Sequence, residues 1–467
     1  MTRGPRVAVI GGGLAGLAAA LECADRGARV TLLERRNRLG GLTWSFRHEG
    51  RWIDNGQHVF LRCCDQYLWF LDRIGAASDV ELPDRLDIPV VAPPATPGGA
   101  ARWGRLRRTD LPAPFHLAAS LLRYPHLTRR DRLGLGRAVW ALRTLDLADP
   151  ALDRQTFGAW LRQHGQSAGA VAGLWDLITV PTVNLPAEEA SLAMAAKVFQ
   201  TGLLTDTGAA DIGWSRVPLG QLHGERAALA LAQAGVEVRL GVQVERIERG
   251  GPAGSGWRFG VCAGDASLGA DAVVAAVPHD VTGGLLPASS IAHQDRLGEL
   301  GTSAIVDVHL VFDRPVTRWP LLAGLHSPVQ WVFDRTESSG LPVTPGGTQY
   351  VAVSVSAADG LITRRPDELV PWVTAELTRL LPEAAGAQVL DSLVTKERKA
   401  TFRARPGTAS LRPGPRTAWP GLAVAGAWTD TGWPATMEGA VRSGRAAAET
   451  CLTARQSFDY PHTEEVA

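Results

Sequence analysis

Lysine is scarce in this chain of 467 residues: only Lys197, Lys396 and Lys399 occur, so nearly all of its 48 basic residues are arginine. The 47 acidic residues balance them, and a net charge of +1 gives no global electrostatic attraction for nucleic acid. Cysteine is also rare: five residues and no Cys-x-x-Cys pair argue against a disulfide framework and a zinc site. We therefore expect no metal, no nucleic-acid partner and a reducing compartment.

Long apolar runs are absent as well. No stretch of about 18 apolar residues occurs, so no transmembrane helix is predicted. Met1 to Arg6 lead into a short strand without the apolar segment of a signal peptide, and none is expected. With 45% hydrophobic and 20% charged residues, the composition is that of a globular protein with a length of two to three domains.

A glycine-rich motif stands near the beginning of the chain. The β-branched run 6–10 predicts a buried strand, and a helix with Leu14 and Ala15 in its first turn is expected soon after it. A second strand over 29–33 ends at Glu34. Between the first strand and the helix, the spacing GxGxxG is formed by Gly11, Gly13 and Gly16.

Each part of this motif has a physical role in binding a dinucleotide. Gly11 allows a tight turn, Gly13 lets a pyrophosphate approach the backbone, and Gly16 lets the helix pack on the strand. The helix N-terminus offers unpaired amides to the phosphates. Glu34 can accept hydrogen bonds from ribose hydroxyls and would repel a 2′-phosphate, which favours FAD or NAD over NADP. The alternative is a chance cluster of glycines in a turn.

The segment Arg35-Arg-Asn-Arg-Leu-Gly-Gly41 follows directly. A Gly-Gly doublet after the acid is not part of the NAD dehydrogenase pattern. It resembles the E-x-x-x-R-x-G-G segment of FAD proteins of the amine oxidase and phytoene desaturase superfamily. That resemblance implies an FAD site that includes Arg35 and Leu42, with the phosphates lined by Arg38, Gly40 and Gly41. Leu42 stands where the family often has arginine.

Two further segments narrow the resemblance. Asp54-Asn-Gly-Gln-His58 stands where superfamily members run along the isoalloxazine ring, and a strand over 421–426 is followed by W-T-D-T-G-W-P-A-T-M-E-G-A-V-R-S-G, ending at Gly444. Together they resemble the squalene-associated FAD-dependent desaturase branch, whose activity is hydroxysqualene dehydroxylation. The resemblance also places Val244 at the adenine of the FAD. Its other implied contacts with the cofactor are Gly56, Gln57, His58, Gly426, Asp430, Pro434, Ala435, Thr436 and Ala440.

The final helix is expected to begin at about Thr436. Its N-terminal amides would point at the pyrimidine edge of the flavin and stabilise negative charge on the reduced ring. Ala427 stands where the family commonly has an acid, and Asp430 is expected to compensate. No cysteine lies near this segment, so the FAD is expected to be non-covalent.

The implied reaction is reductive loss of an allylic hydroxyl from a C30 isoprenoid alcohol, with hydride from reduced flavin. In an apolar pocket, hydroxide can leave only if its oxygen is protonated or hydrogen-bonded. The candidate proton donors are His58, Asp54 and Asp430, and the sequence does not decide among them. Alternatively, Asp54 and Asn55 cap a turn and His58 is a core histidine. An external reductant must reload the flavin, since no second nucleotide motif is present.

An arginine-rich stretch occupies the middle of the chain. Residues 102–143 hold ten arginines and two aspartates, interleaved with apolar residues such as Trp103, Leu133 and Trp140. This mixture suits an anionic membrane surface, and a solvated helical face is the alternative. We expect a cytoplasmic protein, peripherally attached to the inner face of the cell membrane, with a hydrophobic isoprenoid substrate.

Other segments predict local structure. Residues 86–100 are expected to form a loop, and 236–247 to form a strand and its continuation. The segment 184–191 has the pattern N-x-P-x-E-x-A-S. We expect Pro186 to start a helix there and the segment to have a structural role. In strands 303–312 and 350–355 of an antiparallel sheet, one face is expected to wall an apolar pocket. In the first of these strands, one face carries Val306, Val308, Leu310 and Phe312.

The predicted fold class is α/β, with a Rossmann-like FAD-binding domain built on a parallel sheet. A second, α+β domain would bind substrate through an antiparallel sheet and a helical, membrane-facing part. The FAD-binding domain is expected over 1–79, 217–279 and 415–452, the substrate domain over 80–216 and 280–414, and a tail over 453–467. The alternatives are a carotenoid desaturase or amine oxidase and, outside enzymes, an isoprenoid-binding escort protein.

Overall fold

The computed structural model describes residues 4–94, 96, 99–250 and 257–456. A five-stranded parallel sheet has the order β10-β2-β1-β14-β20. The chain enters at its centre, runs outward to β10 and returns to β14 on the other side of β1, which creates a crevice at the carboxyl ends of β1 and β14. The strands are β1 (Arg6–Ile10), β2 (Arg29–Glu34), β10 (Glu237–Leu240), β14 (Ala272–Ala275) and β20 (Leu422–Val424).

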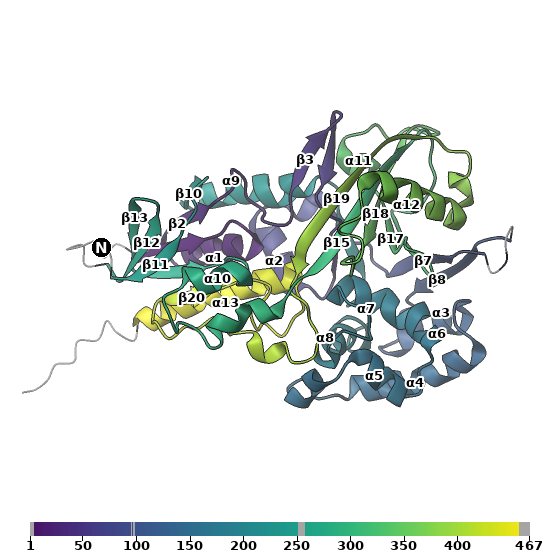
Figure 1. Cartoon of the computed structure of the whole chain (residues 1–467), viewed down its shortest axis with the longest axis horizontal. Coiled ribbons are helices and arrows are strands. Elements are labelled where there is room, and N and C mark those ends of the chain that lie inside the picture. Colours follow the sequence, from purple (N-terminus) through teal and green to yellow (C-terminus); the bar gives the residue numbers. More distant parts are fainter. Residues whose placement is uncertain (1–3, 95, 97–98, 251–256, 457–467) are drawn as a thin grey trace, which may run out of the picture.

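Both faces of the parallel sheet are covered, as its short apolar strands require. Val7 and Val9 of β1 face a helical layer, whereas Ala8 and Ile10 face a three-stranded antiparallel sheet and α10 (His279–Leu285). Figure 1 shows these layers at the left of the molecule. The helices are α1 (Leu14–Asp25), α2 (Asp65–Arg73), α9 (Arg226–Gln233) and α13 (Met437–Gln456), and the three strands are β11 (Arg246–Arg249), β12 (Phe259–Ala263) and β13 (Ala266–Ala270).

A larger, seven-stranded sheet has the order β19-β15-β18-β17-β16-β7-β8. The antiparallel strands predicted near 303–312 and 350–355 are confirmed. The apolar face of β15 packs against α12 (Pro366–Leu380) in a buried core, so this face does not wall a pocket. For the opposite face of the sheet, the expected pocket stays a prediction. The strands are β7 (Asp87–Ala92), β8 (Arg102–Arg107), β15 (Ser303–Phe312), β16 (Leu321–Gly324), β17 (Trp331–Asp334), β18 (Gln349–Val355) and β19 (Val389–Thr401).

A helical part lies beside this sheet, at the lower right of Figure 1. In the described ranges, no helix is both long and apolar enough to cross a membrane. The predicted α/β class, with a parallel sheet and a second part that contains an antiparallel sheet and helices, is confirmed. The helices of this part are α3 (Ala118–Arg123), α4 (Arg129–Arg143), α5 (Phe157–Gln163), α6 (Ala168–Ala170), α7 (Asp176–Val183) and α8 (Leu192–Phe199).

Three local predictions are wrong. Part of the expected loop 86–100 is β7, whose buried residues pair with β8 and β16. The stretch 236–247 forms β10 and part of β11 in two different sheets, because Gly241 turns the chain with a φ of +71°. Pro186 begins a turn, and α8 starts only at Leu192, after Ser191 as its N-cap.

Asn184 supports the structural role expected of its segment, because its amide joins α7 to the large sheet. Asn184 Nδ2 donates to the carbonyl of Ser303 at 3.1 Å, and its Oδ1 accepts from the amide of Ala357 at 2.6 Å.

Two small sheets complete the fold of the described residues. They are the pair β3 (Ser45–His48) and β4 (Arg51–Asp54), and the trio β5 (Val59–Leu61), β9 (Ile212–Ser215) and β6 (Val80–Glu81). At the other end, α13 extends to Gln456, and 457–467 of the predicted tail lie outside the described residues.

Candidate active site

The GxGxxG turn lies at the crevice between β1 and β14. Gly11 has a φ of +106°, and a Cβ there would lie 2.3 Å from the carbonyl oxygen of Ala276, just after β14. A Cβ on Gly16 would lie 1.8 Å from the carbonyl oxygen of Gly11, so helix and strand approach as closely as predicted. α1 begins at Leu14 with Gly13 as its N-cap and no side-chain cap, which leaves its end as a ready site for an anion.

The Gly-Gly doublet packs directly on this turn. The amide of Gly40 donates to the carbonyl of Gly12 at 2.9 Å, and a Cβ on Gly41 would lie 2.8 Å from Cα of Gly13. Both residues of the doublet have positive φ, +96° and +59°. Two segments about thirty residues apart thus form one cradle of bare backbone, which we call the glycine cradle; it consists of residues 11–16, 40 and 41. It fits a pyrophosphate that lies against main-chain amides.

Glu34 ends β2 beside the cradle and is buried, with 8% of its surface exposed. Its Oε2 accepts from the amide of Gly12 at 2.6 Å, and its Oε1 accepts from the amide of Arg36 at 2.8 Å. The amide of Val242 donates to the carbonyl of Glu34 at 2.9 Å, which brings the half-buried Val244 to the same end of the cradle. A ribose and an adenine fit this end.

Arg38 lies between the cradle and the rest of the site. Its Nη1 donates to the carbonyl of Gly41 at 3.0 Å, and its guanidinium lies 4.0 Å from the ring centroid of Trp44. Burial lowers the pKa of Arg38 to about 10, which shows that the charge has lost part of its hydration. A phosphate would restore a favourable environment for it. Arg35 and Leu42, by contrast, are exposed.

The two helices that the sequence assigned to the flavin lie side by side and run in the same direction (Figure 1). A Cβ on Gly444 of α13 would lie 2.0 Å from the carbonyl oxygen of Ala15, and Cys451 contacts Cys23 about two turns further along both helices. Their N-termini therefore point to the same edge of the sheet. Because α13 begins seven residues before Gly444, its N-terminus reaches about 10 Å beyond that of α1.

The start of α13 is held in a defined position. Thr436 Oγ1 accepts from the amide of Gly439 at 3.1 Å, as an N-cap does. Arg412, which sequence patterns did not reveal, is buried and donates to the carbonyls of Trp428 and Trp433 at 3.2 and 2.8 Å. This Arg412 clamp orders the loop before the helix. The loop includes Gly426, with a φ of +145°, and leads to Pro434, Ala435 and, within the helix, Ala440.

Asp430 lies apart from the other two predicted proton donors. It is exposed, its Oδ1 accepts from the amide of Gly432 at 3.3 Å, and it lines a surface pocket of about 410 Å³ with Glu22 and Glu449. Asp54 and His58, by contrast, lie within one short segment that begins at the last residue of β4. The structure therefore brings together two of the three predicted acids and leaves Asp430 at the surface.

Asp54 is the anchor of its segment. Its Oδ2 accepts from Arg335 Nη2 at 2.7 Å in an ion pair whose side chains are only 5% and 8% exposed. Its Oδ1 accepts from Ser45 Oγ at 2.6 Å and from the amide of Leu219 at 2.9 Å. Both oxygens are occupied by donors, so the geometry favours a structural role. Asn55 acts similarly, because its Oδ1 accepts from the amide of Trp44 at 3.1 Å.

His58 is a neutral imidazole in this environment. Its Nδ1 lies 3.2 Å from the carbonyl oxygen of Gly56, and since a carbonyl only accepts, Nδ1 carries the proton. Burial lowers the pKa of His58 below its ordinary value, so the ring stays uncharged at neutral pH and Nε2 holds a lone pair. Beside it, Nε2 of Gln57 is buried without a hydrogen-bond partner among the described residues.

Asp307 is another site residue that the sequence patterns did not reveal. It lies on the face of β15 opposite to Val306 and Val308, is 1% exposed, and accepts a hydrogen bond from the amide of Gln57. Its Oδ1 is buried without a partner among the described residues. Burial, together with the charge of Asp54, raises the pKa of Asp307 to about 7. The available signal was a polar residue in the middle of an apolar strand.

Trp44 joins the two halves of the site. The ring of Trp44 stacks with Arg38 at the cradle, and its backbone exchanges hydrogen bonds with Asn55. Gly56 follows, and a Cβ on Gly56 would lie 3.5 Å from Oδ2 of Asp307. The cradle and the buried carboxyl of Asp307 are therefore connected by direct contacts. The site as a whole fits a dinucleotide with a reactive ring at the end remote from Glu34.

Comparison with known proteins identifies the protein family to which the chain belongs. A family model described as flavin containing amine oxidoreductase matches residues 14–452, and the chain therefore belongs to this family. A double mutant of putrescine oxidase has the same fold, with a TM-score of 0.71 and 19% identity over 96% of this chain and 99% of that chain. The predicted superfamily, the fold and the assignment as a flavin-dependent oxidoreductase are confirmed.

Two relatives indicate which branch of this flavoprotein family the chain resembles. The chain is 30% identical over 457 residues to hydroxysqualene dehydroxylase of Rhodopseudomonas palustris, which covers 96% of this chain and 98% of that protein. It is 26% identical over 486 residues to probable zeta-carotene desaturase of Synechococcus elongatus, with 96% and 99% covered. The predicted resemblance to the hydroxysqualene dehydroxylase branch is thus confirmed.

Proposed function

We propose that this chain converts hydroxysqualene to squalene by reductive dehydroxylation, in squalene and hopanoid biosynthesis. The observation that carries the proposal is the match to hydroxysqualene dehydroxylase over nearly the whole of both chains. It is supported by a site in which a dinucleotide cradle connects to buried polar groups suited to the removal of a hydroxyl. The substrate is a hydrophobic isoprenoid alcohol.

The cofactor in this proposal is non-covalent FAD, which supplies a hydride when it is bound in its reduced form. Glu34 accepts hydrogen bonds from the ribose, the glycine cradle and Arg38 bind the phosphates, and the N-terminus of α13 meets the pyrimidine edge of the ring. The remaining predicted flavin contacts keep the roles that the resemblance implies. They are Arg35, Leu42, Gly56, Gln57, His58, Val244, Gly426, Asp430, Pro434, Ala435 and Ala440.

The chain's own residues prepare the reacting end of the site. The ion pair between Asp54 and Arg335 ties the segment that contains Gln57 and His58 to the large sheet, because the amide of Arg335 donates to the carbonyl of Tyr350 in β18. Fixed backbone in this segment orients the donors that receive the leaving oxygen, and burial keeps bulk water out. An external electron donor must reduce the flavin again after each turnover.

The substrate reaches the site from a membrane surface in this proposal. Half of the large hydrophobic side chains that are exposed in the described residues lie within 103–147, among them Leu133, which is 86% exposed, and Trp140, which is 60% exposed. Two other apolar residues of the arginine-rich stretch, Tyr124 and Leu127, are buried instead, because they pack in the core of the helical part. The exposed residues place an apolar, arginine-rich face on α3 and α4.

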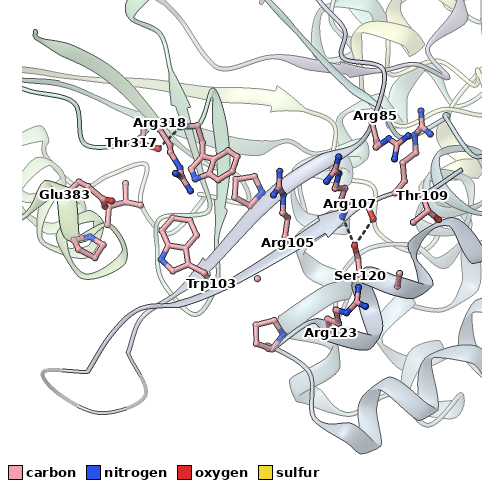
Figure 2. Close-up of a pocket in the computed structure, with 18 of the residues that line it drawn as sticks. Arg85, Trp103, Arg105, Arg107, Thr109, Ser120, Arg123, Thr317, Arg318 and Glu383 are labelled. Carbon is pink, nitrogen blue, oxygen red and sulfur yellow. Dashed lines mark hydrogen bonds between the residues drawn. The ribbon is translucent and has the colours of Figure 1, made fainter. Parts of the chain in front are cut away.

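An arginine-lined cavity of about 960 Å³ adjoins this face (Figure 2). Figure 2 shows Arg105 and Arg107 rising from one side of β8, opposite Arg123 on α3. Asp87 forms ion pairs with Arg105 and Arg107, so the cavity keeps only part of its positive charge. It suits the phosphate of an anionic lipid, and we propose peripheral attachment to the inner face of the cell membrane.

A carotenoid desaturase is the second candidate function, because relatives named zeta-carotene desaturase match with 26% and 27% identity over 96% of the chain. A single experiment separates the two. Purified enzyme with photoreduced FAD is given hydroxysqualene, and oxidised enzyme is given phytoene or zeta-carotene. Formation of squalene with stoichiometric flavin oxidation supports dehydroxylation. Carotene desaturation without squalene formation contradicts it.

The predicted FAD-binding and substrate domains each contain one of the two main sheets. The segments 1–79, 217–279 and 415–452 contain the five strands of the parallel sheet, and 80–216 and 280–414 contain the seven strands of the large sheet. We propose that the first group binds FAD and the second binds substrate. Asp307 would then bring a polar group of the substrate part to the flavin.

A further inference from the structure

A buried carboxyl group faces the reacting end of the proposed site. Asp307 lies at the centre of β15, paired with Ser354 of β18 on one side and Thr395 of β19 on the other. It is 1% exposed, and its Oδ1 has no hydrogen-bond partner in the described part of the chain. A buried polar atom without a partner is costly, and such atoms are found where a ligand is received.

Among the described residues around Asp307, the cation Arg335 is already paired with Asp54, the last residue of β4. The charge of Asp54 faces Asp307 and is balanced by Arg335. His58, from the segment that begins at Asp54, is neutral because burial lowers its pKa. Along β15, burial lowers the pKa of His309 to about 3, and this ring is held by Tyr350 and Thr395.

A carboxyl group in this environment keeps its proton up to a higher pH than an exposed aspartate does. Burial raises the pKa of Asp307 to about 7, with hydrogen bonds from Ser354 and the amide of Gln57 acting in the opposite direction. A general acid is most effective when its pKa lies near the working pH. The other predicted donors lack these properties: Asp54 already accepts from three donors, and Asp430 is exposed.

A second unpaired group accompanies Asp307. Nε2 of Gln57 is also buried without a partner among the described residues, and the backbone of Gln57 contacts Asp307. An alcohol oxygen has two lone pairs and can accept two hydrogen bonds. The protonated carboxyl and the Gln57 amide would together provide two donors for one hydroxyl.

We propose that Asp307 is the general acid that protonates the hydroxyl of the allylic alcohol as it leaves, with Gln57 as the second donor to the same oxygen. The inference rests on the proposed function and names the residue that performs its acid step. The C–O bond breaks, its electron pair stays on oxygen, and the proton of Asp307 completes a molecule of water. Carbon then gains the hydride that reduced flavin supplies, so the substrate is reduced by two electrons and the flavin is oxidised by two.

The test combines kinetics with a readout that does not depend on turnover. In holoenzyme with photoreduced FAD, the rate of a single turnover with hydroxysqualene is followed from pH 5 to pH 9. We expect the wild-type rate to fall above about pH 7, and Asp307→Asn to lower it by about 100-fold or more. Asp307→Glu should keep the pH dependence and recover at least a tenth of the rate. Asp313→Asn, just beyond the same strand, should match the wild type.

Infrared difference spectra of oxidised holoenzyme, wild type minus Asp307→Asn, give the direct readout. A protonated carboxyl band that disappears with a midpoint near pH 7 supports the assignment, and a carboxyl already ionised at pH 5 overturns it. If Asp307→Asn does not fold, the pH dependence of the wild type and of Asp307→Glu decides. Wild-type enzyme that makes no squalene overturns the proposed function together with this step. Squalene formation by Asp307→Asn at the wild-type rate overturns the role of Asp307 alone.

Discussion

A substitution at Gly444 tests whether α13 must lie as close to α1 as it does. The distance between these helices also sets where both of their N-termini lie. A Cβ at Gly444 would lie 2.0 Å from the carbonyl oxygen of Ala15 and 3.1 Å from the amide nitrogen of Ala19. Contact between such atoms is comfortable only beyond about 3.5 Å, so Gly444→Ala must push the helices apart by about 1 Å or more. Overpacking of this kind costs about 1–3 kcal/mol.

The displacement should also weaken flavin binding. We expect the dissociation constant of FAD to rise about tenfold, since a rigid helix carries the shift to its N-terminus and about 1.4 kcal/mol of binding energy is enough for this change. Urea unfolding of the flavin-free chain gives the stability, and quenching of flavin fluorescence gives the affinity.

The matched control is Gly136→Ala in α4, where an added Cβ would meet no atom within 4 Å. It should leave FAD affinity unchanged and stabilise the chain by up to about 1 kcal/mol, because alanine favours a helix over glycine. If Gly444→Ala behaves like Gly136→Ala in both assays, the close packing of the two helices does not position the flavin, and the reasoning is refuted.

Three other predictions follow from the buried charges and the exposed apolar face. Because the pKa of Asp307 is about 7 in the folded state and near 4 when unfolded, the folded state binds more protons between these values. The free energy of unfolding should therefore fall by about 3 kcal/mol from pH 4 to pH 7, and Asp307→Asn should remove this slope in chemical denaturation curves. Arg335→Met should destabilise the chain by about 3–5 kcal/mol because it leaves Asp54 as an unpaired buried charge, and adding Asp54→Asn should recover much of the loss; equal stability of single and double variants would contradict this. Leu133→Glu with Trp140→Glu should lower pelleting with anionic vesicles at least fivefold, whereas pelleting that ignores these changes, salt and lipid charge would exclude this face as the membrane contact.

The start and the end of the chain could be predicted well because their signals are local. The strand, the three glycines, the helix and Glu34 follow one another within thirty residues, and each has a backbone reason for its residue type. The beginning of the last helix was likewise marked by Thr436 and the proline before it. In these segments the local sequence and the tertiary fold favour the same structure.

The reacting end of the site depends on partners that are distant in sequence. Asp54 and Arg335 are 281 residues apart, and nothing local to either residue indicates the pair. Alternation in β15 showed two faces, but only the packing of α12 decides that the apolar face is covered, which leaves Asp307 on the other face. The clamp of Arg412 on three backbone carbonyls leaves no pattern in the sequence.

The composition of the segments 86–100 and 102–143 did not indicate the structure that they adopt. β7 contains a proline within a stretch rich in proline, alanine and glycine, yet its neighbours β8 and β16 make it a strand. In 102–143 the count of arginines was informative, but the strand β8 and the buried Tyr124 are set by the large sheet and the helical core. Burial decided by nonlocal packing cannot be read from a local count of residues.

The central claim is that the amides after β1 and those at the start of α13 bind the same flavin. Hydrogen–deuterium exchange of the full chain, titrated with FAD, measures both segments in one experiment. We predict that amides near Leu14 and near Met437 become protected together, with the same midpoint in FAD concentration. Protection of only one of these segments, or of the two at different concentrations, would contradict the claim.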